Sequence, residues 1–549
     1  MKTQMSIESK MQSKSEEEST ELIKKGEAYL GSEDYEEAKK GFKEALELDE
    51  NNTKAWRSLG LVQRNLEEYD DAIKSYKKAI EIDKEDVDTL IGLGRVYFDL
   101  KDYESAKECL AKAIELDEEN INAWFNLGAT HSNLKNYEEA KKCFEKVTEL
   151  EPKNPNGWLK LGSAYLMMDR PVEARKSSMI STVLDPKSTD AWLVAGRAQL
   201  TLKRYNEAVE SFKKSTELNE KNVDAWIGLG LSHSISGAPK EAKECFEKAI
   251  KLDEKNVDAW RSLGLEQSDL EEYENAIESY KKAIELDKES FGAWIFLGWA
   301  YYNLKKHEEA KKSFEKAIKL DEKNVDAWRS LGLAQRNLKE YNDAIRSYKK
   351  VIEIDKENVD AWIGLGRTYL NLKDDKKAKE CFENATQLDE NNVVAWERLG
   401  VSYVKLKNYE EAKKCFEKAI KLDPKDEGTT ASLIELLIIK GNYGEAFEKA
   451  RANVDLSESG KYRFLSLFFA TVSLALENKQ EEFMEWLNKL LQYIQKAEKP
   501  WGISWDFSDI RLTLEQHLKK DDKTLISLLI DVLKEEKELV ELEKELKKR

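Results

Sequence analysis

Apolar residues in this chain recur at one fixed, long interval, which the tryptophans Trp294, Trp328 and Trp362 mark most clearly. Within each period, positions 4, 7, 8 and 11 are apolar or small, as in Trp328, Leu331 and Gly332. The i, i+3, i+4, i+7 spacing marks one face of a helix. Positions 20, 24 and 27 mark the face of a second helix, after a short polar stretch. The pattern therefore predicts a helical hairpin in every period.

Thirteen such units run from Ser19 to Gly460. Position 4 is tryptophan in ten units, position 8 is glycine in twelve, position 20 is always alanine, and position 24 is mostly phenylalanine or tyrosine. Glycine and alanine have almost no side chain, so we expect the two helices to approach closely there, with the tryptophan filling the space beside them. A single hairpin of this length cannot bury both faces, but stacked neighbours can.

The pattern W-x2-L-G-x2-Y…A-x3-F…A…P resembles the tetratricopeptide repeat, and the array is similar to those of prokaryotic and archaeal proteins of that family. The resemblance implies an all-α fold: a right-handed α-solenoid, or superhelix, of about thirteen 34-residue helix-turn-helix units, closed by a C-terminal helical cap. It also implies a concave groove lined by the first helices. The thirteenth unit is degenerate, because Thr430 and Ile434 replace its tryptophan and glycine.

Three parts are expected along the chain. Residues 1–18 are polar and predict a flexible segment, 19–460 form the repeats, and 461–549 form a capping region. The capping region is expected to hold helices over 462–476, 481–496, 508–519 and 523–548, and a folded aromatic connector over 499–507. The spacing of Leu539, Leu542 and Leu546 also allows a short self-associating helix.

The charge balance narrows the class of partner. Lysine and arginine number 90 and aspartate and glutamate 107, which gives a net charge of −17. This balance argues against general binding to nucleic acid or to an anionic membrane. The longest apolar run, 464–476, is too short to span a bilayer and predicts a buried helix. With no secretory segment and no close cysteine pair, we expect a cytoplasmic protein.

No pattern in the chain points to catalysis, a cofactor or a metal. All five cysteines occupy position 23, where other units have mostly serine, so we expect them to fill a small packing space. The four histidines are scattered, and no phosphate-binding, zinc-protease or nucleophile-elbow motif occurs. Long repeat arrays precede the catalytic domain of O-GlcNAc transferases, but the segment after Gly460 is too short for a nucleotide-sugar domain. We therefore expect a protein that is not an enzyme.

Arginine is the main candidate for recognition. In the family that the chain resembles, positions 2, 5, 6, 9, 12 and 13 face the groove. Most of the arginines of the repeats fall there, whereas lysine dominates the second helices. The planar guanidinium can bind a carboxylate or a phosphate through two hydrogen bonds. Equally, these arginines could pair with acidic neighbours such as Asp224, Asp258, Asp326 and Asp360 and orient the repeats. The residues are Arg57, Arg64, Arg95, Arg197, Arg261, Arg329, Arg336, Arg367 and Arg398.

Aromatic residues give a second candidate. Trp299 is the one tryptophan of the repeats outside position 4, and Tyr302 and Ile295 share its face. Arg261 and Arg329 occupy position 5 of the flanking units. This group could anchor a peptide side chain, or it could contact its own neighbouring units. Phe125, at position 5 of its unit, belongs to the same predicted face.

The favoured function is a protein-interaction scaffold or adaptor that holds a peptide or helix in the groove. The partner would be a protein or peptide, acidic or anchored by an aromatic residue, and neither nucleic acid nor a membrane. The alternative is a structural protein that self-associates weakly through its C-terminal helices.

Overall fold

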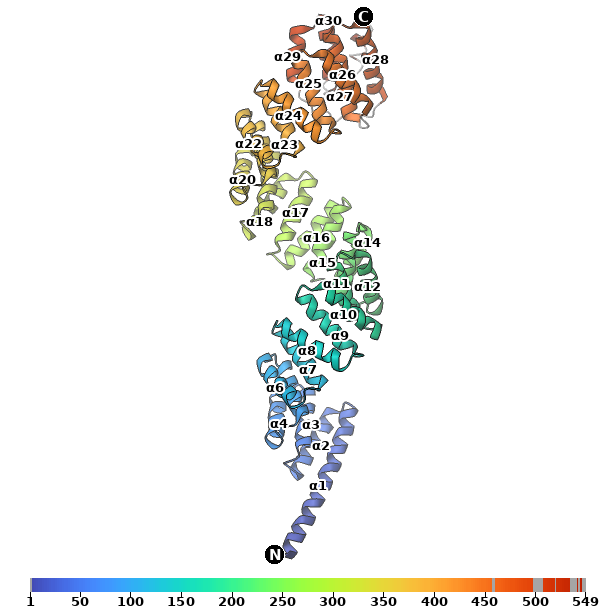
Figure 1. Cartoon of the computed structure of the whole chain (residues 1–549), viewed down its shortest axis with the longest axis vertical. Helices are drawn as coiled ribbons and strands as arrows, with labels where there is room; N and C mark the ends of the chain where they lie inside the picture. The colour runs from blue at the N-terminus through green and yellow to red at the C-terminus, as the bar shows by residue number, and fades with distance from the viewer. Residues whose placement is uncertain are drawn as a thin grey trace. The chain divides into compact units, whose positions relative to one another are not determined.

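The computed structural model consists of helices alone over the residues it describes, which are 2–456, 460–496, 507–518, 520–533, 541 and 544–545. The predicted all-α class and the succession of helix pairs are confirmed (Figure 1). The chain forms two compact units, Met1–Lys288 and Glu289–Arg549. In the part of the chain that is described, no helix combines the length and apolar composition needed to cross a bilayer.

The first unit alternates first and second helices of the repeats. Its first helices are α1 (Lys2–Gly31), α3 (Thr53–Asn65), α5 (Val87–Asp99), α7 (Ile121–Asn133), α9 (Pro155–Met167), α11 (Thr189–Thr201), α13 (Val223–Ile235) and α15 (Val257–Asp269). Its second helices are α2 (Tyr35–Leu48), α4 (Tyr69–Ile82), α6 (Tyr103–Leu116), α8 (Tyr137–Leu150), α10 (Pro171–Leu184), α12 (Tyr205–Leu218), α14 (Pro239–Leu252) and α16 (Tyr273–Leu286). Helix α1 includes residues 2–18, for which composition had predicted a flexible segment.

The second unit continues the alternation and ends in four further helices. Its first helices are α17 (Phe291–Asn303), α19 (Val325–Asn337), α21 (Val359–Asn371), α23 (Val393–Lys405) and α25 (Glu427–Ile439). Its second helices are α18 (His307–Leu320), α20 (Tyr341–Ile354), α22 (Asp375–Leu388), α24 (Tyr409–Leu422) and α26 (Tyr443–Leu456). The last four are α27 (Gly460–Leu476), α28 (Gln480–Lys496), α29 (Ser508–His517) and α30 (Lys520–Leu533).

Most hairpins are held by a ring seated against a glycine. A Cβ added at Gly60 would lie 2.9 Å from the ring of Tyr76, and one at Gly332 would lie 3.0 Å from that of Tyr348. Both distances are shorter than carbon atoms readily tolerate, which explains why position 8 is glycine wherever position 24 carries a ring. The prediction that small residues permit a close helix approach is confirmed, but the ring at position 24 fills the space, not the tryptophan.

The tryptophans at position 4 are half-buried and have a different role. The Nε1 of Trp56 donates a hydrogen bond to the carbonyl of Glu50 over 2.8 Å, and that of Trp328 donates to Glu322 over 2.9 Å. Each bond joins the start of a first helix to the loop before it. The tryptophans pack at the edge of the hydrophobic clusters of their repeats, as Trp56 and Trp362 do, while the ring at position 24 takes the space directly against the glycine.

The turn inside each hairpin has one residue with positive φ, at position 15. These residues include lysine and glutamate as well as glycine, for example Lys373 with φ 59° and Gly237 with φ 79°. The turns ahead of α10 and α14 have the same geometry, with positive φ at Asp169 and Gly237, although Pro171 and Pro239 begin the second helix there. Proline is tolerated there because the N–H it lacks would have no helical partner.

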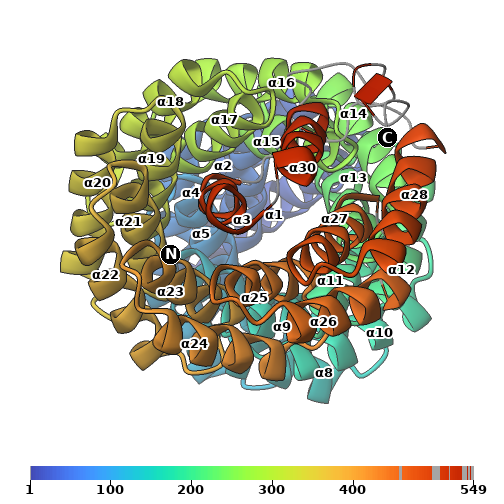
Figure 2. The ribbon, with the colours of Figure 1, turned by 90° about the horizontal axis from the view of Figure 1, so that it is seen from above.

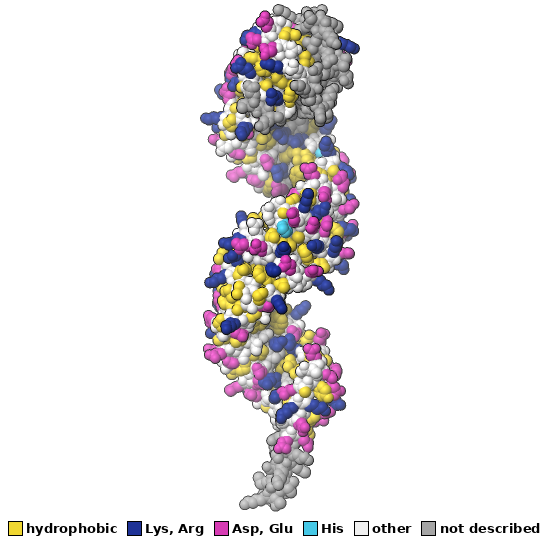
Figure 3. All heavy atoms as spheres, turned by 90° about the vertical axis from the view of Figure 1, so that its right-hand side faces the viewer, with side chains coloured by type: hydrophobic (Ala, Val, Ile, Leu, Met, Phe, Trp, Pro, Cys, Tyr) yellow, Lys and Arg dark blue, Asp and Glu magenta, His cyan; other side chains and the backbone are white. Residues whose placement is uncertain are grey.

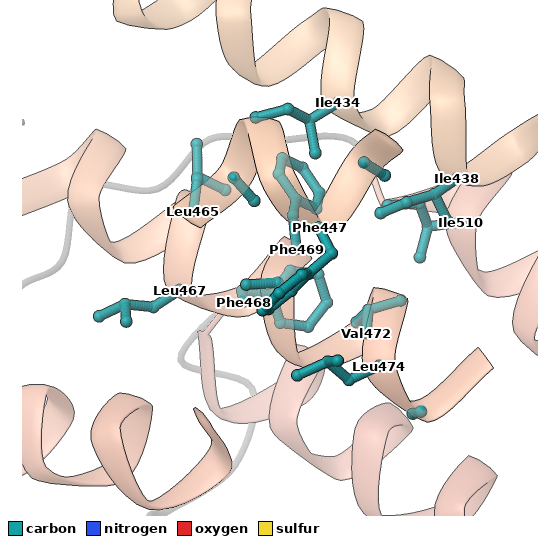
Figure 4. Packing of buried hydrophobic residues seen from close by; sticks show 14 of the residues in the cluster. Ile434, Ile438, Phe447, Leu465, Leu467, Phe468, Phe469, Val472, Leu474 and Ile510 are labelled. Carbon is teal, nitrogen blue, oxygen red and sulfur yellow. The ribbon is translucent and has the colours of Figure 1, made fainter. Parts of the chain in front are cut away.

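The C-terminal helices cover the end of the repeat array. One buried cluster joins Phe416 of α24 and Ile434 of α25 to Phe468 of α27, Leu487 of α28 and Ile510 of α29, and Figure 4 shows part of it. Residues 464–476 are all buried, as predicted for this apolar run. The four predicted helices are thus present over their described residues, whereas most of the 499–507 connector and Leu539, Leu542 and Leu546 lie outside the described residues. The boundaries at 18 and 460 stay predictions.

Candidate interaction surface

Within each of the two units, the first helices present a surface formed by positions 2, 5, 6, 9, 12 and 13 of each repeat, which we call the first-helix face. Seen along the stack, α17, α19, α21 and α23 line the inner side of the second unit, with α18, α20, α22 and α24 outside them (Figure 2). Successive first helices touch, as α19 does with α21 and α21 with α23. Side chains of neighbouring units can therefore act together on this face.

Most arginines of the face are paired with carboxylates. Arg57 Nη1 lies 3.0 Å from Asp86 Oδ1 and 3.2 Å from Asp88 Oδ2, and Arg64 Nε lies 2.6 Å from Asp99 Oδ2. Similar pairs join Arg197 to Asp224, Arg261 to Asp258, and Arg329 to Asp326 and Asp360. Arg57, Arg64, Arg197 and Arg329 have partners in the next repeat, which supports the interpretation that they orient neighbouring repeats. The partner of Arg261 lies on its own helix, α15. Such half-exposed pairs each contribute about 0–1 kcal/mol.

Three arginines of the second unit differ from the rest. Arg336, Arg367 and Arg398 lie on α19, α21 and α23 at positions 12, 9 and 6 of successive repeats, so that each stands about one helical turn earlier on its helix than the one before. Among the described residues, neither Arg336 nor Arg367 forms an ion pair with a carboxylate. Arg398 Nε lies 3.0 Å from Oε2 of the adjacent Glu397 but finds no hydrogen-bond partner in the described part of the chain. We call these three residues the arginine row.

The electrostatics show that the members of the row affect one another. The surrounding protein removes water from Arg367, and the positive charges of Arg398 and Arg336 act with this desolvation to lower its pKa. Burial raises the pKa of Glu397, and the charge of Asp426 adds to this rise, whereas Arg398 and Arg367 oppose it. The arginine row therefore lies near two carboxylates, those of Glu397 and Asp426.

A related arrangement in the first unit is better compensated. Arg64 and Arg95 lie on α3 and α5, again at positions 12 and 9 of successive repeats, and Asp99 binds Arg64. Desolvation lowers the pKa of Arg95, and the charge of Arg64 adds to this effect, whereas that of Asp99 opposes it. Sequence analysis had named the arginines but not Asp99 or Glu397. A search for carboxylates on the first-helix face of the repeat that follows each arginine would have found both.

The aromatic candidates are packed within the second unit. The ring of Trp299 lies 5.5 Å from that of Tyr302 and 5.7 Å from that of Phe314, centre to centre, in edge-on contacts. The Tyr302 hydroxyl accepts a hydrogen bond from Asn337 Nδ2 over 2.6 Å. Trp299, Tyr302 and Ile295 are all half-buried and pack against one hydrophobic cluster. These contacts support the interpretation that the group stabilises its own units, while its exposed part remains a candidate anchor.

Two other predicted residues have separate places. Phe125 packs edge-on against Phe144, with 5.8 Å between ring centres, and is half-buried. Arg261 belongs to the first unit, and Trp299 and Arg329 to the second. The predicted group of an aromatic floor between Arg261 and Arg329 thus draws on both units and stays a prediction.

The cysteines are packing residues. Cys143, Cys245, Cys381 and Cys415 are buried and Cys109 is half-buried, and all five are free thiols. Burial raises the pKa of Cys381 to about 12 and that of Cys109 to about 11, which keeps both protonated at neutral pH. Across the described residues, no group of three histidine, cysteine, aspartate or glutamate side chains is placed to hold a metal ion.

Acidic and basic side chains are interspersed on the surface seen in Figure 3.

Family comparisons match most of the repeat region. The tetratricopeptide repeat models match residues 297–359, 337–399 and 393–426. A model described as the TPR domain of cytochrome c-type biogenesis protein H matches residues 4–154. One described as the C-terminal domain of cilia and flagella-associated protein 70 matches residues 118–324. No curated protein matches the chain by sequence.

Several solved structures are similar to the chain. The Cut9–Hcn1 hetero-tetramer of the APC/C is 16% identical and covers 83% of this chain and 96% of that chain, with a TM-score of 0.37. Yeast Tom70 is 18% identical and covers 81% of this chain and 99% of that chain, with a TM-score of 0.38. YrrB, described as a TPR protein with an unusual peptide-binding site, is 25% identical and covers 34% and 96%, with a TM-score of 0.31.

Proposed function

Because this chain is a tetratricopeptide repeat protein, we propose that it is a non-catalytic interaction scaffold whose first-helix face binds a peptide or a helix of a partner protein. The observation that carries the proposal is a constant framework with a variable face. Glycine at position 8 and alanine at position 20 recur, whereas position 5 is Arg329, Ile363 and Glu397 in three consecutive units. Side chains on the first-helix face differ from one repeat to the next, while the framework that holds them stays the same. Such a surface suits recognition of one particular partner sequence.

A photo-crosslinking experiment on the full chain tests this proposal. A photoreactive amino acid replaces the half-buried Leu333 on the first-helix face of α19 or, as the matched control, the exposed Lys349 on α20. After incubation with native lysate and irradiation, mass spectrometry identifies the attached peptides. We expect Leu333 to capture specific peptides and Lys349 to capture none of them. Capture from Lys349 alone, or equal capture from both positions, would contradict the proposal.

The alternative of self-association through the C-terminal helices stays a prediction. Light scattering on the full chain, at concentrations that span the crosslinking experiment, measures it directly. A monomer at every concentration would remove that alternative.

A further inference from the structure

The second helix of the fifth repeat, α10, buries small hydroxyl side chains where most other second helices bury larger apolar ones. Its position 24 is Ser178, whereas most repeats have a phenylalanine or tyrosine ring there. The Ser178 hydroxyl is buried and donates to the carbonyl of Ala174 over 2.8 Å, and that of Ser181 donates to the carbonyl of Pro155 over 2.8 Å. The buried side of α10 is therefore unusually polar.

The outward side of α10 is apolar instead. It carries Val172, Met179, Ile180 and Val183, whose i, i+7, i+8, i+11 spacing places them on one side of the helix. The exposed fraction is 63% for Val172 and 76% for Val183, which makes Val183 the most exposed large aliphatic side chain among the described residues. Met179 and Ile180 are half-buried. We call these four residues the α10 stripe.

Neighbouring second helices carry charges at the same positions. In α12, Lys214 and Glu217 at positions 26 and 29 form an ion pair of 2.7 Å, and α8 has an equivalent pair. In α10 these two positions are Ile180 and Val183. Helices α8, α10 and α12 lie on the outer side of the first unit, with α9 and α11 inside them (Figure 2). The α10 stripe is thus one helix wide and has charged surface on either side.

One lysine within this side of α10 lacks the partner that its counterpart has. Lys142 of α8, at position 22, lies 2.7 Å from Glu139, at position 19. The corresponding pair in α10 would be Lys176 and Glu173, but Glu173 binds Arg170. Among the described residues, the exposed Lys176 forms no ion pair. A single uncompensated positive charge therefore lies beside the α10 stripe.

We propose that the α10 stripe binds an amphipathic helix of a partner protein, which places its apolar side chains along the stripe and a carboxylate against Lys176. Exposed apolar patches rimmed by polar residues mark interaction sites. Residues 172–183 extend about 16 Å along the helix axis, which matches three turns of a partner helix. The inference goes beyond the proposed function, because α10 is a second helix and contributes nothing to the first-helix face.

Two other occupants fit the α10 stripe less well. A stable dimer buries roughly 800 Å² on each partner, which four side chains with charged neighbours cannot supply. Two copies that each carry a charge of −17 also repel one another. An anionic membrane is disfavoured because the flanking helices place glutamates such as Glu217 beside the stripe. A narrow helix with a complementary acidic residue meets neither obstacle.

Fluorescence polarisation with the full chain tests the proposal. The probe is a fluorescein-labelled helical peptide with leucine along one face, glutamate beside it and alanine elsewhere, and a scrambled peptide of the same composition is its control. The variant Ile180→Lys with Val183→Glu installs the ion pair of α12, so it should fold normally. We expect it to weaken binding of the amphipathic peptide about tenfold or more. The matched control on α12, Lys214→Glu with Glu217→Lys, should change affinity by less than about twofold.

A charge reversal tests the role of Lys176. Lys176→Glu should weaken binding of the glutamate peptide severalfold, because the two carboxylates then repel. A peptide with lysine in place of glutamate should bind Lys176→Glu more tightly than it binds the wild type. The absence of this rescue would contradict the proposed contact between Lys176 and a carboxylate.

Four further results would overturn the inference. Equal binding of the amphipathic and scrambled peptides is the first, and unchanged affinity in Ile180→Lys with Val183→Glu at unaltered helicity is the second. Light scattering that shows a dimer only for the wild type would assign the α10 stripe to a second copy. Binding to phosphatidylserine–phosphatidylcholine vesicles that this variant abolishes would assign it to a membrane. Capture at Leu333 reports on the scaffold proposal alone, because α19 and α10 belong to different units.

Discussion

The repeats around Tyr76 and those around Tyr348 are two copies of one framework, one in each unit of the molecule, and they differ in their exposed chemistry. The Ser75 hydroxyl donates to Gln63 Oε1 over 2.6 Å, and the Ser347 hydroxyl donates to Gln335 Oε1 over 2.7 Å. On the first-helix face, however, Asp99 neutralises Arg64 in the first copy. The corresponding Arg336 of the second copy has asparagine, Asn371, in place of that aspartate. Residues 54–86 and 326–358 are closely similar in sequence and alike in packing, whereas the charges of the face differ.

The largest expected effect tests the shared framework. Tyr76→Ala and Tyr348→Ala should each destabilise the fold by about 3–5 kcal/mol, because each ring is almost fully buried against glycine. Hydrogen exchange of the surrounding helices measures the loss locally, which suits an array whose units can unfold separately. A loss confined to one of the two copies would show that their packing is not equivalent.

A smaller effect tests the second glycine that these rings contact. Gly92→Ala and Gly364→Ala should each cost about 1–3 kcal/mol, since the added methyl group would overlap Tyr76 or Tyr348 of the preceding repeat. Urea denaturation followed by circular dichroism measures both. Gly31→Ala, where a Cβ would meet nothing within 4 Å, is the control and should be close to neutral. Neutral behaviour at position 92 or 364 would contradict the proposed close contact.

Removal of a helix cap should destabilise the two copies by different amounts, and this difference is smaller than the effects above. Asp86 caps α5 and also binds Arg57, while Asn358 caps α21 by accepting from the N–H of Ala361 over 3.0 Å. Asn358→Ala should therefore cost about 1 kcal/mol, and Asp86→Ala up to about 1 kcal/mol more. Urea midpoints at constant m-value measure the difference. The double variants combine Asp86→Ala with Arg57→Ala and Asn358→Ala with Arg329→Ala. An equal cost of the cap substitution in these two backgrounds would confirm that the difference comes from the Arg57–Asp86 ion pair.

The smallest effect concerns pH. Because burial raises the pKa of Glu397 above its ordinary value of 4.5, the folded state favours its protonated form. The stability from that form is fully present below pH 4.5 and is lost as the pH rises through the folded pKa. Glu397→Gln should flatten this part of the stability profile and raise the free energy of unfolding at neutral pH. The exposed Glu357→Gln is the control, and a profile that changes equally in both variants would contradict the assignment.

Much of the fold could be predicted from the sequence. The apolar period located the thirteen hairpins, and the C-terminal helices were expected near their observed ranges. These features depend on residues within one repeat, such as Gly332 and Tyr348, which lie close together along the chain. Prediction failed where a side chain had two possible environments. Tryptophan was expected to fill the space beside the close helix contact, but the Tyr76 ring lies against Gly60, and Trp56 lies half-buried with its Nε1 bonded to a backbone carbonyl.

The candidate surface was only partly predictable. The sequence identified the arginines but left open whether they bind a ligand or pair with acidic neighbours. The structure supports pairing at some positions and not at others. Arg329 is satisfied by Asp326 and Asp360, whereas Arg367 faces like charges. Both residues are arginines at positions expected to face the groove. Neither the residue type nor the position within the repeat could therefore distinguish Arg329 from Arg367.

The sequence by itself determined the helices, their pairing and the packing inside each hairpin, because periodicity and residue size act over short distances along the chain. Only the tertiary structure decided which arginines are neutralised. Arg64 and Asp99 belong to different repeats, and their 2.6 Å contact depends on how one repeat stacks on the next. The attraction between two charges weakens as their separation grows, so compensation is set by that stacking and not by composition.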